Sequence, residues 1–447
     1  MSAARRVLVV SPHFPPDSSA AAHRARLLAP HLAAHGWEPT VVAVDPRDCE
    51  GRLEPALLEL VPPSLEVRRV RAFRRRLGVG DLGLRAFVGL ERACASLLAA
   101  RRYDALYVTI YPAYPALLGP ILKRRFGVPF VLDYQDPWVG EWGRGIGGGP
   151  GGRPDLKSRL SRALATRLEP IAVAAADAVT AVSAGTWRGV VERNPALAAR
   201  PCLELPIGFE PADAAVATSR PRRPLPFAPD DGDFHLCAVG TVAPLFLETL
   251  EAIFSAARAL RARDPRLGAR LRLHFFGTSG QHGDLAGERV MPLARRLGVE
   301  DFVDEAPARL DYLDALALGA RASALLLPGS SEPHYTASRI FPSLLAGRPI
   351  LAVYHRASSG PEILARAAPA SARVVTFDEA APVATHVPAI ADALAAMMSA
   401  ASPSPAPVDL AAIADLSAPA LAARLASLFD EVSAARRPPS TRGTPTP

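Results

Sequence analysis

Short apolar runs alternate with segments of helical period along the chain. The first run, residues 7–10, is rich in β-branched side chains, and a loop of serine and proline follows it. Beyond the loop, apolar residues recur at the spacing of one helix face and predict a helix from about Ser19 to the glycine at 36: Ala22, Leu27, Leu28 and Leu32. The run "PTVVAV" predicts the next strand. Strand, loop, helix and strand in this order open a doubly wound α/β domain.

The second half of the chain repeats this architecture without repeating the sequence. Three strand-like runs, "FHLCAV", "RLRLHFF" and "SALLLP", each lead into a small loop, and helical segments separate them. A chain of 447 residues also exceeds what one hydrophobic core normally serves. The sequence therefore predicts two Rossmann-like, doubly wound α/β domains.

Shifts in composition set the expected boundaries. The first Rossmann-like domain is expected over residues 1–208, and the segment 209–232, dense in proline and charge, is expected to be a linker. The second Rossmann-like domain is expected over 233–385. Alanine-rich helices within 386–435 are expected to pack back towards the N-terminal domain, and 436–447 is expected to be a disordered tail.

The chain is basic, with 51 lysines and arginines against 44 acidic residues. No zinc-finger, helix-turn-helix or RNA-binding signature accompanies this charge, so no nucleic-acid partner is expected. Arginines interleaved with apolar residues gather within residues 68–76: Arg68, Arg69, Arg71, Arg74, Arg75 and Arg76. They predict a peripheral contact with anionic lipid headgroups or an acidic acceptor, with a solvated arginine-rich surface as the alternative.

Apolar run length bears on the expected location. No run reaches the roughly 20 residues needed to cross a bilayer, and the N-terminal run is too short for a signal peptide. We therefore expect a cytoplasmic protein, with peripheral contact at the inner face of the plasma membrane.

The stretch "GSSEPHYTASRIFPSLLAGRPILAV", residues 329–353, predicts a loop, a helix and a strand. Free N–H groups at such a helix start form an anion site. Pro342 lies where the helix should run, and because proline is tolerated in a first helical turn, the helix is expected to begin near residues 338–341. Thr336, Ser338 and Arg339 are then predicted to contact phosphates, and the alternative for Arg339 is a solvated helix start.

Several motifs stand in an order that resembles glycosyltransferase family 4. They are "SPHFPPDSSAAAH", "VLDYQDPWVG", "ADAVTAVSAGTW" and "LPIGFEP", followed by "AVGTVAP" and "HFFGTSG", and the resemblance covers residues 7–434. It implies the GT-B fold, in which two Rossmann-like domains face a cleft, the first binding the acceptor and the second the donor. It also implies retaining transfer of a sugar from a nucleotide-diphosphate donor to a glycan or lipid-linked acceptor in cell-surface polysaccharide synthesis. No metal is expected, and no cofactor beyond the nucleotide-sugar co-substrate.

The sequence departs from the family pattern at the donor site. Many relatives carry an arginine and a lysine where this chain has Thr241 and Phe246, and paired glutamates where it has His334 and Pro342. The phosphate role is therefore assigned to the loop before Pro342, and Glu332 and His334 are candidates for the hydroxyls of the donor sugar.

The remaining candidates follow strand ends. Asp136, in "DYQDPW", is the expected catalytic residue that orients the acceptor or donor sugar; a helix or turn cap is its alternative, and Asp133 is read as a buried structural carboxylate. Ser18 and Ser19, as helix N-caps, and Gln135 form the expected acceptor-side loop. The expected donor-binding residues are Thr241, Gly277, Thr278, Ser279, Glu332, His334, Thr336, Ser338 and Arg339.

Two other functions compete with this interpretation. The first is a non-catalytic GT-B protein that binds a nucleotide sugar or a partner enzyme, which the missing glutamate and the missing Arg/Lys pair favour. The second is an epimerase acting on UDP-linked sugars, which would need no acceptor.

Overall fold

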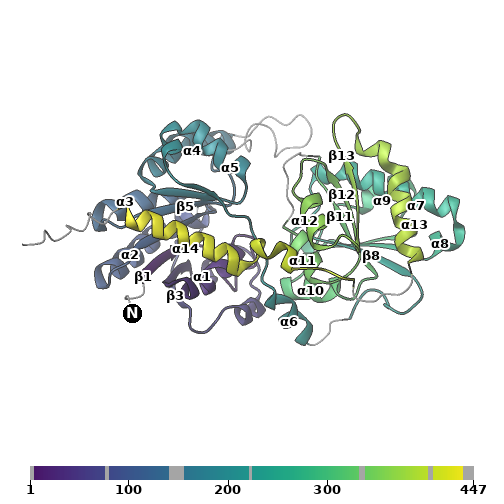
Figure 1. Ribbon diagram of the computed structural model, residues 1–447, viewed down its shortest axis with the longest axis horizontal. Coiled ribbons are helices and arrows are strands. Elements are labelled where there is room, and N and C mark those ends of the chain that lie inside the picture. Colours follow the sequence, from purple (N-terminus) through teal and green to yellow (C-terminus); the bar gives the residue numbers. More distant parts are fainter. Residues whose placement is uncertain are drawn as a thin grey trace, which may run out of the picture. The chain divides into compact units, whose positions relative to one another are not determined.

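The computed structural model describes residues 5–75, 80–139, 156–220, 224–331, 338–400 and 406–435 (Figure 1). The chain divides into two compact units. The N-terminal unit comprises Met1–Gly208 together with Ala418–Pro447, and the second unit comprises Phe209–Ser417. Each unit is described by itself below.

The N-terminal unit is built on a seven-stranded sheet with the order β3-β2-β1-β4-β5-β6-β7. All its strand pairs are parallel. The strands are β1 (Arg5–Val10), β2 (Trp37–Val44), β3 (Glu66–Val70), β4 (Ala105–Ile110), β5 (Phe130–Tyr134), β6 (Ala178–Ala181) and β7 (Cys202–Glu204). The helices are α1 (Ala22–Leu32), α2 (Leu82–Ala100), α3 (Leu118–Phe126), α4 (Leu156–Ala175), α5 (Ala184–Arg193) and α14 (Ala418–Ala434).

Alternate residues of β1 face opposite sides of this sheet, as the period of a strand requires. Val7 and Val9 pack in a core with side chains of α1 and α14, whereas Leu8 and Val10 pack in a core with side chains of α2 and α3. Both faces are therefore covered. This double cover explains why the strands read as continuous apolar runs rather than as alternating ones.

The C-terminal helix α14 belongs to the N-terminal unit, where it packs along α1 (Figure 1). Trp37 fixes this contact: its indole Nε1 donates to Asp430 at 2.8 Å, and its ring meets Phe429 edge-on with centroids 5.2 Å apart. Within the segment expected to form alanine-rich helices, α14 begins at Ala418, and residues 411–416 before it form a 3₁₀ turn.

The second unit is built on a six-stranded sheet with the order β10-β9-β8-β11-β12-β13, again with parallel pairs throughout. The strands are β8 (Phe234–Val239), β9 (Leu271–Phe276), β10 (Val303–Ala306), β11 (Ala324–Pro328), β12 (Ile350–His355) and β13 (Ala372–Phe377). The helices are α6 (Ala212–Ser219), α7 (Leu247–Arg263), α8 (Pro265–Ala269), α9 (Met291–Leu297), α10 (Tyr312–Gly319), α11 (Ile340–Leu345), α12 (Gly360–Ala367) and α13 (Val387–Ser399).

Two segments differ from the boundaries expected from composition. The expected linker contains α6, which packs against α10, and the Tyr312 hydroxyl donates to Asp213 at 2.8 Å. The helices expected as one C-terminal block separate, since α13 packs against α7 in the second unit while α14 lies in the N-terminal unit. A segment rich in proline and charge indicates where the chain leaves a sheet, but this composition does not show which elements the segment packs against.

The two parallel, doubly wound sheets confirm the predicted fold class. In the first six strands of each sheet, counted in chain order, the spatial order is 3-2-1-4-5-6, the classic dinucleotide-fold order. Among the described helices, none is both long and apolar enough to cross a membrane.

Candidate functional site

Ligands of open parallel sheets bind at the carboxyl ends of the strands, where the chain order reverses. This switch point lies between β1 and β4 in the N-terminal unit and between β8 and β11 in the second unit. Most of the residues singled out from the sequence follow the carboxyl ends of strands β1, β5, β8, β9 and β11.

At the first switch point, the loop after β1 holds a histidine and an aspartate that sequence reasoning missed. His13 Nδ1 lies 2.5 Å from Asp17 Oδ2, and the Ser19 N–H donates to Asp17 Oδ1 at 2.8 Å. Asp17 is buried, which alone would raise its pKa, but the bond and charge of His13 lower the pKa below its ordinary value. In the neutral imidazole, an ionised Asp17 fixes the proton on Nδ1, and Nε2 then presents a lone pair. The i, i+4 spacing of His and Asp in "HFPPD" was the available signal.

Tyr111 and Asp136 lie beside this pair. The rings of His13 and Tyr111 are 5.8 Å apart, and Tyr111 follows the carboxyl end of β4. Burial, followed by the charge of Asp136, raises the pKa of Tyr111, which places Asp136 within electrostatic range. The Asp136 side chain is exposed, and partial desolvation raises its pKa. The structure thus brings Asp136 to the same switch point as His13.

Ser18 and Ser19 are not N-caps, contrary to the sequence prediction. Helix α1 begins at Ala22 with Ala21 in the cap position and no side-chain cap. The Ser18 hydroxyl instead donates to the carbonyl of Arg52 at 2.8 Å. The two serines shape the loop that holds Asp17.

Gln135 is buried at the carboxyl end of β5. Its side chain is 8% exposed, and its Nε2 amide makes no hydrogen bond within the described part of the chain. Buried donors of this kind normally have a partner. Gln135 therefore offers a donor to a bound hydroxyl or carbonyl.

Asp133 is the buried structural carboxylate that one sequence interpretation allowed. Arg24 donates to both its oxygens, at 2.9 and 2.6 Å, and the Thr180 hydroxyl donates at 2.6 Å. The second Arg24 amine donates to the carbonyls of Leu205 and Pro206 at 2.6 and 3.0 Å. Both charges are fully buried, so this group ties α1 to β5, β6 and the chain beyond β7.

At the second switch point, Arg339, which directly precedes α11, contacts the loop after β8. Its Nη2 donates to the Thr241 carbonyl at 2.6 Å, and its guanidinium lies 4.9 Å from the Phe246 ring centroid. A side chain at Gly240 would approach the guanidinium to 3.6 Å, and the φ of +121° also favours glycine there. The chain therefore brings an arginine from after β11 to the loop that holds Thr241 and Phe246.

Arg339 keeps most of its hydrogen-bonding capacity. A guanidinium has five N–H donors, and one is used within the described residues. It also forms no ion pair with any described carboxylate. A guanidinium that stacks on an aromatic ring and has unused N–H donors is suited to bind a phosphate oxygen.

In the loop after β9, the hydroxyls of Thr278 and Ser279 donate to other protein groups. They are therefore not free to donate to a ligand, as the sequence prediction of donor binding would require. The Thr278 hydroxyl donates to Glu305, whose carboxylate also accepts three backbone N–H bonds at the start of α9. The Ser279 hydroxyl donates to the Pro307 carbonyl at 2.7 Å. Gly277, at φ +71°, turns the chain. Among Gly277, Thr278 and Ser279, the backbone rather than a hydroxyl donor is therefore left to meet a ligand.

Three predicted donor residues, Glu332, His334 and Thr336, lie outside the described residues. Ser338 is described and exposed. Pro342 is the third residue of α11, where the missing N–H costs no helical bond. Helix α11 has six residues, so the positive charge at this strand end is chiefly that of Arg339.

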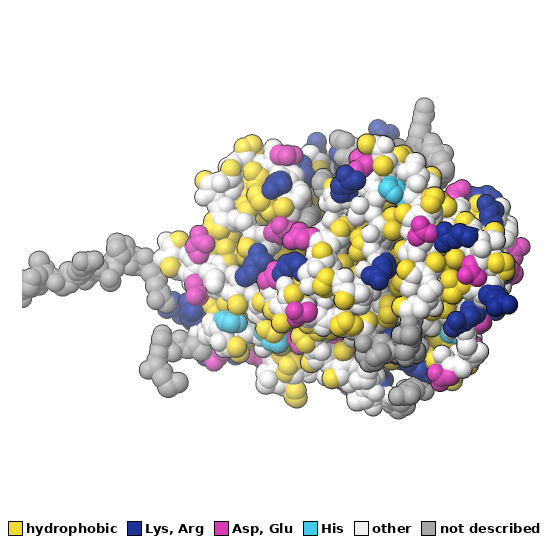
Figure 2. All heavy atoms as spheres, turned by 45° about the vertical axis from the view of Figure 1, so that its right-hand side comes forward, with side chains coloured by type: hydrophobic (Ala, Val, Ile, Leu, Met, Phe, Trp, Pro, Cys, Tyr) yellow, Lys and Arg dark blue, Asp and Glu magenta, His cyan; other side chains and the backbone are white. Residues whose placement is uncertain are grey.

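Three of the six arginines of the cluster make local contacts. Arg68 pairs with Glu66 at 3.4 Å, Arg71 binds Asp48 through two bonds, and Arg69 lies over the ring of Phe14. Arg74 and Arg75 are exposed, and Arg76 lies outside the described residues. On the face shown in Figure 2, basic and acidic side chains are interspersed without a continuous band of one sign.

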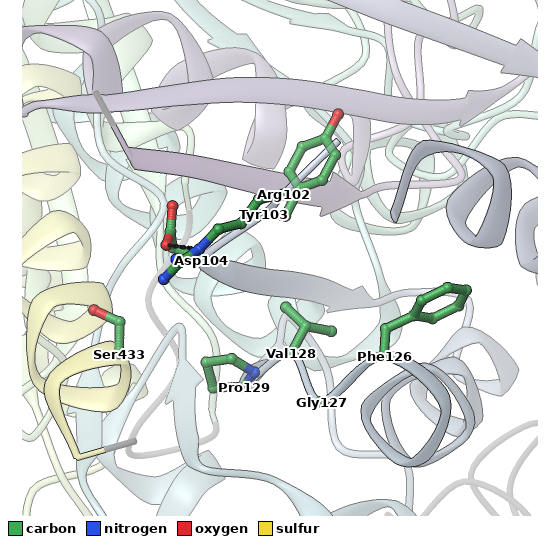
Figure 3. Close-up of a pocket in the computed structure, with 8 residues that line it drawn as sticks. All are labelled: Arg102, Tyr103, Asp104, Phe126, Gly127, Val128, Pro129 and Ser433. Atoms are coloured by element: carbon green, nitrogen blue, oxygen red, sulfur yellow. Dashed lines mark hydrogen bonds and ion pairs between the residues drawn. The ribbon is translucent and has the colours of Figure 1, made fainter. Parts of the chain in front are cut away.

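A pocket of about 620 Å³ lies elsewhere in the N-terminal unit, at the amino ends of β4 and β5 (Figure 3). Its lining consists of Arg102, Tyr103, Asp104, Phe126, Gly127, Val128, Pro129 and Ser433. Arg102 is already paired with Asp104 at 3.0 Å. The pocket is at the strand ends opposite to the switch point, so we do not place the candidate site there.

Comparisons with known proteins agree with this architecture. Residues 19–203 match the family described as Glycosyl transferase 4-like domain. Comparison with curated proteins gave no match.

Three solved structures align with nearly the whole chain. Sucrose-phosphate synthase from Thermosynechococcus elongatus has 15% identity and a TM-score of 0.57, over 96% of this chain and 100% of that one. The α,α-trehalose 6-phosphate synthase of Burkholderia multivorans has 14% identity and a TM-score of 0.58, over 97% and 100%. HepE of Anabaena in complex with UDP-glucose has 13% identity and a TM-score of 0.51, over 96% and 98%. At these identities the likeness is one of fold. The chain therefore has a GT-B-like fold, and its residues 19–203 match a glycosyl transferase 4-like domain.

Proposed function

We propose that this protein is a retaining, metal-independent glycosyltransferase that moves a sugar from a nucleoside-diphosphate donor to a glycan or lipid-linked acceptor in cell-surface polysaccharide synthesis. The second unit binds the donor, and the N-terminal unit binds the acceptor. The observation that carries the proposal is Arg339, a cation at the switch point of the second unit that uses one guanidinium donor within the described residues. The glycosyl transferase 4-like domain match supports the same reaction class.

The donor must lose its diphosphate as the anomeric C–O bond breaks. Negative charge then grows on the phosphate oxygens while the sugar becomes oxocarbenium-like. Arg339 stabilises that charge with two parallel N–H bonds, and Phe246 holds the guanidinium plane in place. The backbone of the loops at Gly240 and Gly277 receives the rest of the nucleotide, and Thr336 and Ser338 extend the phosphate contacts.

The acceptor hydroxyl must lose its proton as the new bond forms. In the retaining mechanism, the departing diphosphate takes this proton on the same face of the sugar. Asp136 orients the reacting sugar, His13 Nε2 accepts a hydrogen bond from a second acceptor hydroxyl, and Asp17 keeps the imidazole in the required tautomer. Gln135 Nε2 donates to a sugar oxygen.

Thermal unfolding against UDP, GDP, CDP and ADP tests the donor site. UDP comes first because HepE, which shares the fold, was solved with UDP-glucose. A nucleotide at a hundredfold excess over its dissociation constant should add about 2.7 kcal/mol of stability. Arg339→Ala should weaken that nucleotide about 10- to 100-fold, because a charge-assisted hydrogen bond is lost.

The matched control is Arg373→Ala, which removes an exposed arginine of the same unit. No stabilisation by any nucleotide, or equal stabilisation of wild type and Arg339→Ala, would contradict the donor assignment.

A further inference from the structure

Three large apolar side chains are exposed together at one corner of the N-terminal unit. Phe73, in the loop after β3, is 66% exposed, and Leu84 and Val88, on α2, are 43% and 40% exposed. Leu84 and Val88 are four residues apart and so share one helix face. Five other large apolar side chains of this unit are exposed as well, so exposure alone does not single out this surface: Leu58, Tyr111, Leu160, Leu164 and Ile171.

The backbone holds this patch in a fixed arrangement. The Phe73 N–H donates to the Arg85 carbonyl at 3.0 Å, and the Arg85 guanidinium returns a bond to the Phe73 carbonyl at 2.8 Å. A side chain at Gly89 would come within 2.7 Å of the Arg71 carbonyl, so the loop and the helix are in direct contact. Phe73 is thus clamped beside the first turns of α2 rather than free to fold inward.

The rim of the patch is cationic. Arg74 and Arg75 follow Phe73, and Arg92 continues the face of Leu84 and Val88 one turn further. All three are exposed, and none forms an ion pair with a described carboxylate. By contrast, the neighbouring Arg71 is neutralised by Asp48. An aromatic and aliphatic patch rimmed by unpaired cations complements an anionic lipid surface, where apolar groups enter the interface and arginines meet headgroups.

The patch borders the first switch point. A side chain at Gly83, in the first turn of α2, would meet Pro112 and Pro115 at 2.6 Å, and these prolines follow Tyr111 in the loop after β4. Asp81, which caps α2 through a 2.7 Å bond to the Leu84 N–H, lies close enough to affect the pKa of Tyr111. A surface bound to Phe73 would therefore lie beside His13 and Asp136.

We propose that Phe73, Leu84 and Val88, with Arg74, Arg75 and Arg92, dock the N-terminal unit on an anionic lipid bilayer. The docking presents the acceptor site to the headgroup layer, so the acceptor is lipid-linked. The choice of acceptor rests on the proposed function, whereas the docking itself does not.

Vesicle co-sedimentation of the full chain tests the proposal. Vesicles of equal parts phosphatidylglycerol and phosphatidylcholine should bind the protein, vesicles of phosphatidylcholine alone should bind it much less, and added salt should release it. Phe73→Ser should weaken binding roughly tenfold, because one large apolar side chain no longer enters the interface. Arg74→Gln and Arg75→Gln should each weaken it about fivefold.

Matched controls distinguish binding through this surface from nonspecific binding to vesicles. Leu285→Ser removes an apolar side chain that is 80% exposed in the second unit, and Arg373→Gln removes an exposed arginine there. Neither should change vesicle binding. The Phe73→Ser protein should keep its nucleotide-dependent stabilisation, so a failed donor site and a failed membrane surface give different results.

Three results would overturn the proposal. They are equal binding to both vesicle types, equal loss in the control variants, and a dimer in solution that Phe73→Ser dissociates, which would assign the patch to a second copy of the chain.

Discussion

Buried His274, which lies beside His235 in the second unit, makes the stability of this unit depend on pH. His235 Nδ1 and His274 Nε2 are 2.9 Å apart, and Phe227 stacks on both rings with centroid distances of 4.3 and 4.8 Å. His235 Nε2 is bonded to Asp231 at 3.0 Å, so it carries a proton and Nδ1 accepts from His274. His274 Nδ1 lies 3.3 Å from Asp304 Oδ2 but makes no aligned hydrogen bond within the described residues.

Burial lowers the pKa of His274 to about 4, from an ordinary value of 6.5. The charged groups around the ring are Asp304, which opposes this shift, His235, Arg272 and Asp231. Between pH 6.5 and 4 the unfolded chain binds a proton that the folded chain does not, so stability falls as the pH is lowered through this window. The two pKa values differ by about 2.5, and a difference of one in pKa is worth about 1.4 kcal/mol. At pH 4, where the folded chain is half protonated, the loss in free energy of unfolding is therefore roughly 3 kcal/mol.

Urea unfolding of wild type and His274→Phe at pH 7 and pH 4 measures this contribution. Phenylalanine keeps the stacking on Phe227 and cannot titrate, so the stability lost on acidification should be smaller in the variant by roughly 3 kcal/mol. His35→Phe, at an exposed position of the other unit, is the control. Far-UV circular dichroism follows both units, and tryptophan fluorescence follows the N-terminal unit, which holds all four tryptophans. An equal acid loss in wild type and His274→Phe would refute the reasoning.

Four further predictions concern the N-terminal unit and the reaction. Asp133→Asn should destabilise this unit by about 3–5 kcal/mol in urea unfolding followed by fluorescence, because Arg24 stays charged and buried without its partner; a loss of only a few tenths would contradict the burial argument. His13→Gln should raise KM for the acceptor about tenfold and leave donor affinity unchanged. Asp136→Ala should lower turnover with nucleotide affinity nearly unchanged, and parallel loss of both would exclude the assigned role. EDTA should not change turnover, and a metal-dependent rate would contradict the proposal.

Sequence patterns predicted the fold because each sheet is covered on both faces. Double cover makes a strand such as β4 apolar at nearly every position, and loops and helices separate such strands at regular intervals. The helix containing Pro342 was also predictable, since proline fits a first turn. The start of α1 was harder to predict. Ser18 resembles a helix cap in the sequence, but its hydroxyl donates to the carbonyl of the distant Arg52.

The candidate site was predicted only where strand ends and local chemistry coincide. Asp136 and Arg339 were singled out in this way, and the structure places both after the ends of strands. Arg24 and Asp133 are 109 residues apart in the sequence. No local pattern indicates that α1 points an arginine into the core beside β5. Likewise, the exposure of Phe73 depends on how its loop is clamped to α2, which its apolar character does not reveal.

Sugar transfer itself tests the central claim most directly. The purified protein should be incubated with the sugar conjugate of the nucleotide that stabilises it, with and without lipid extracts as acceptor, and the release of nucleoside diphosphate followed over time. We predict acceptor-dependent release that falls in Arg339→Ala and a product with the anomeric configuration of the donor. Tight nucleotide binding without release, with any acceptor tested, would contradict transfer and favour a non-catalytic nucleotide-sugar-binding protein; inverted product would contradict the retaining mechanism.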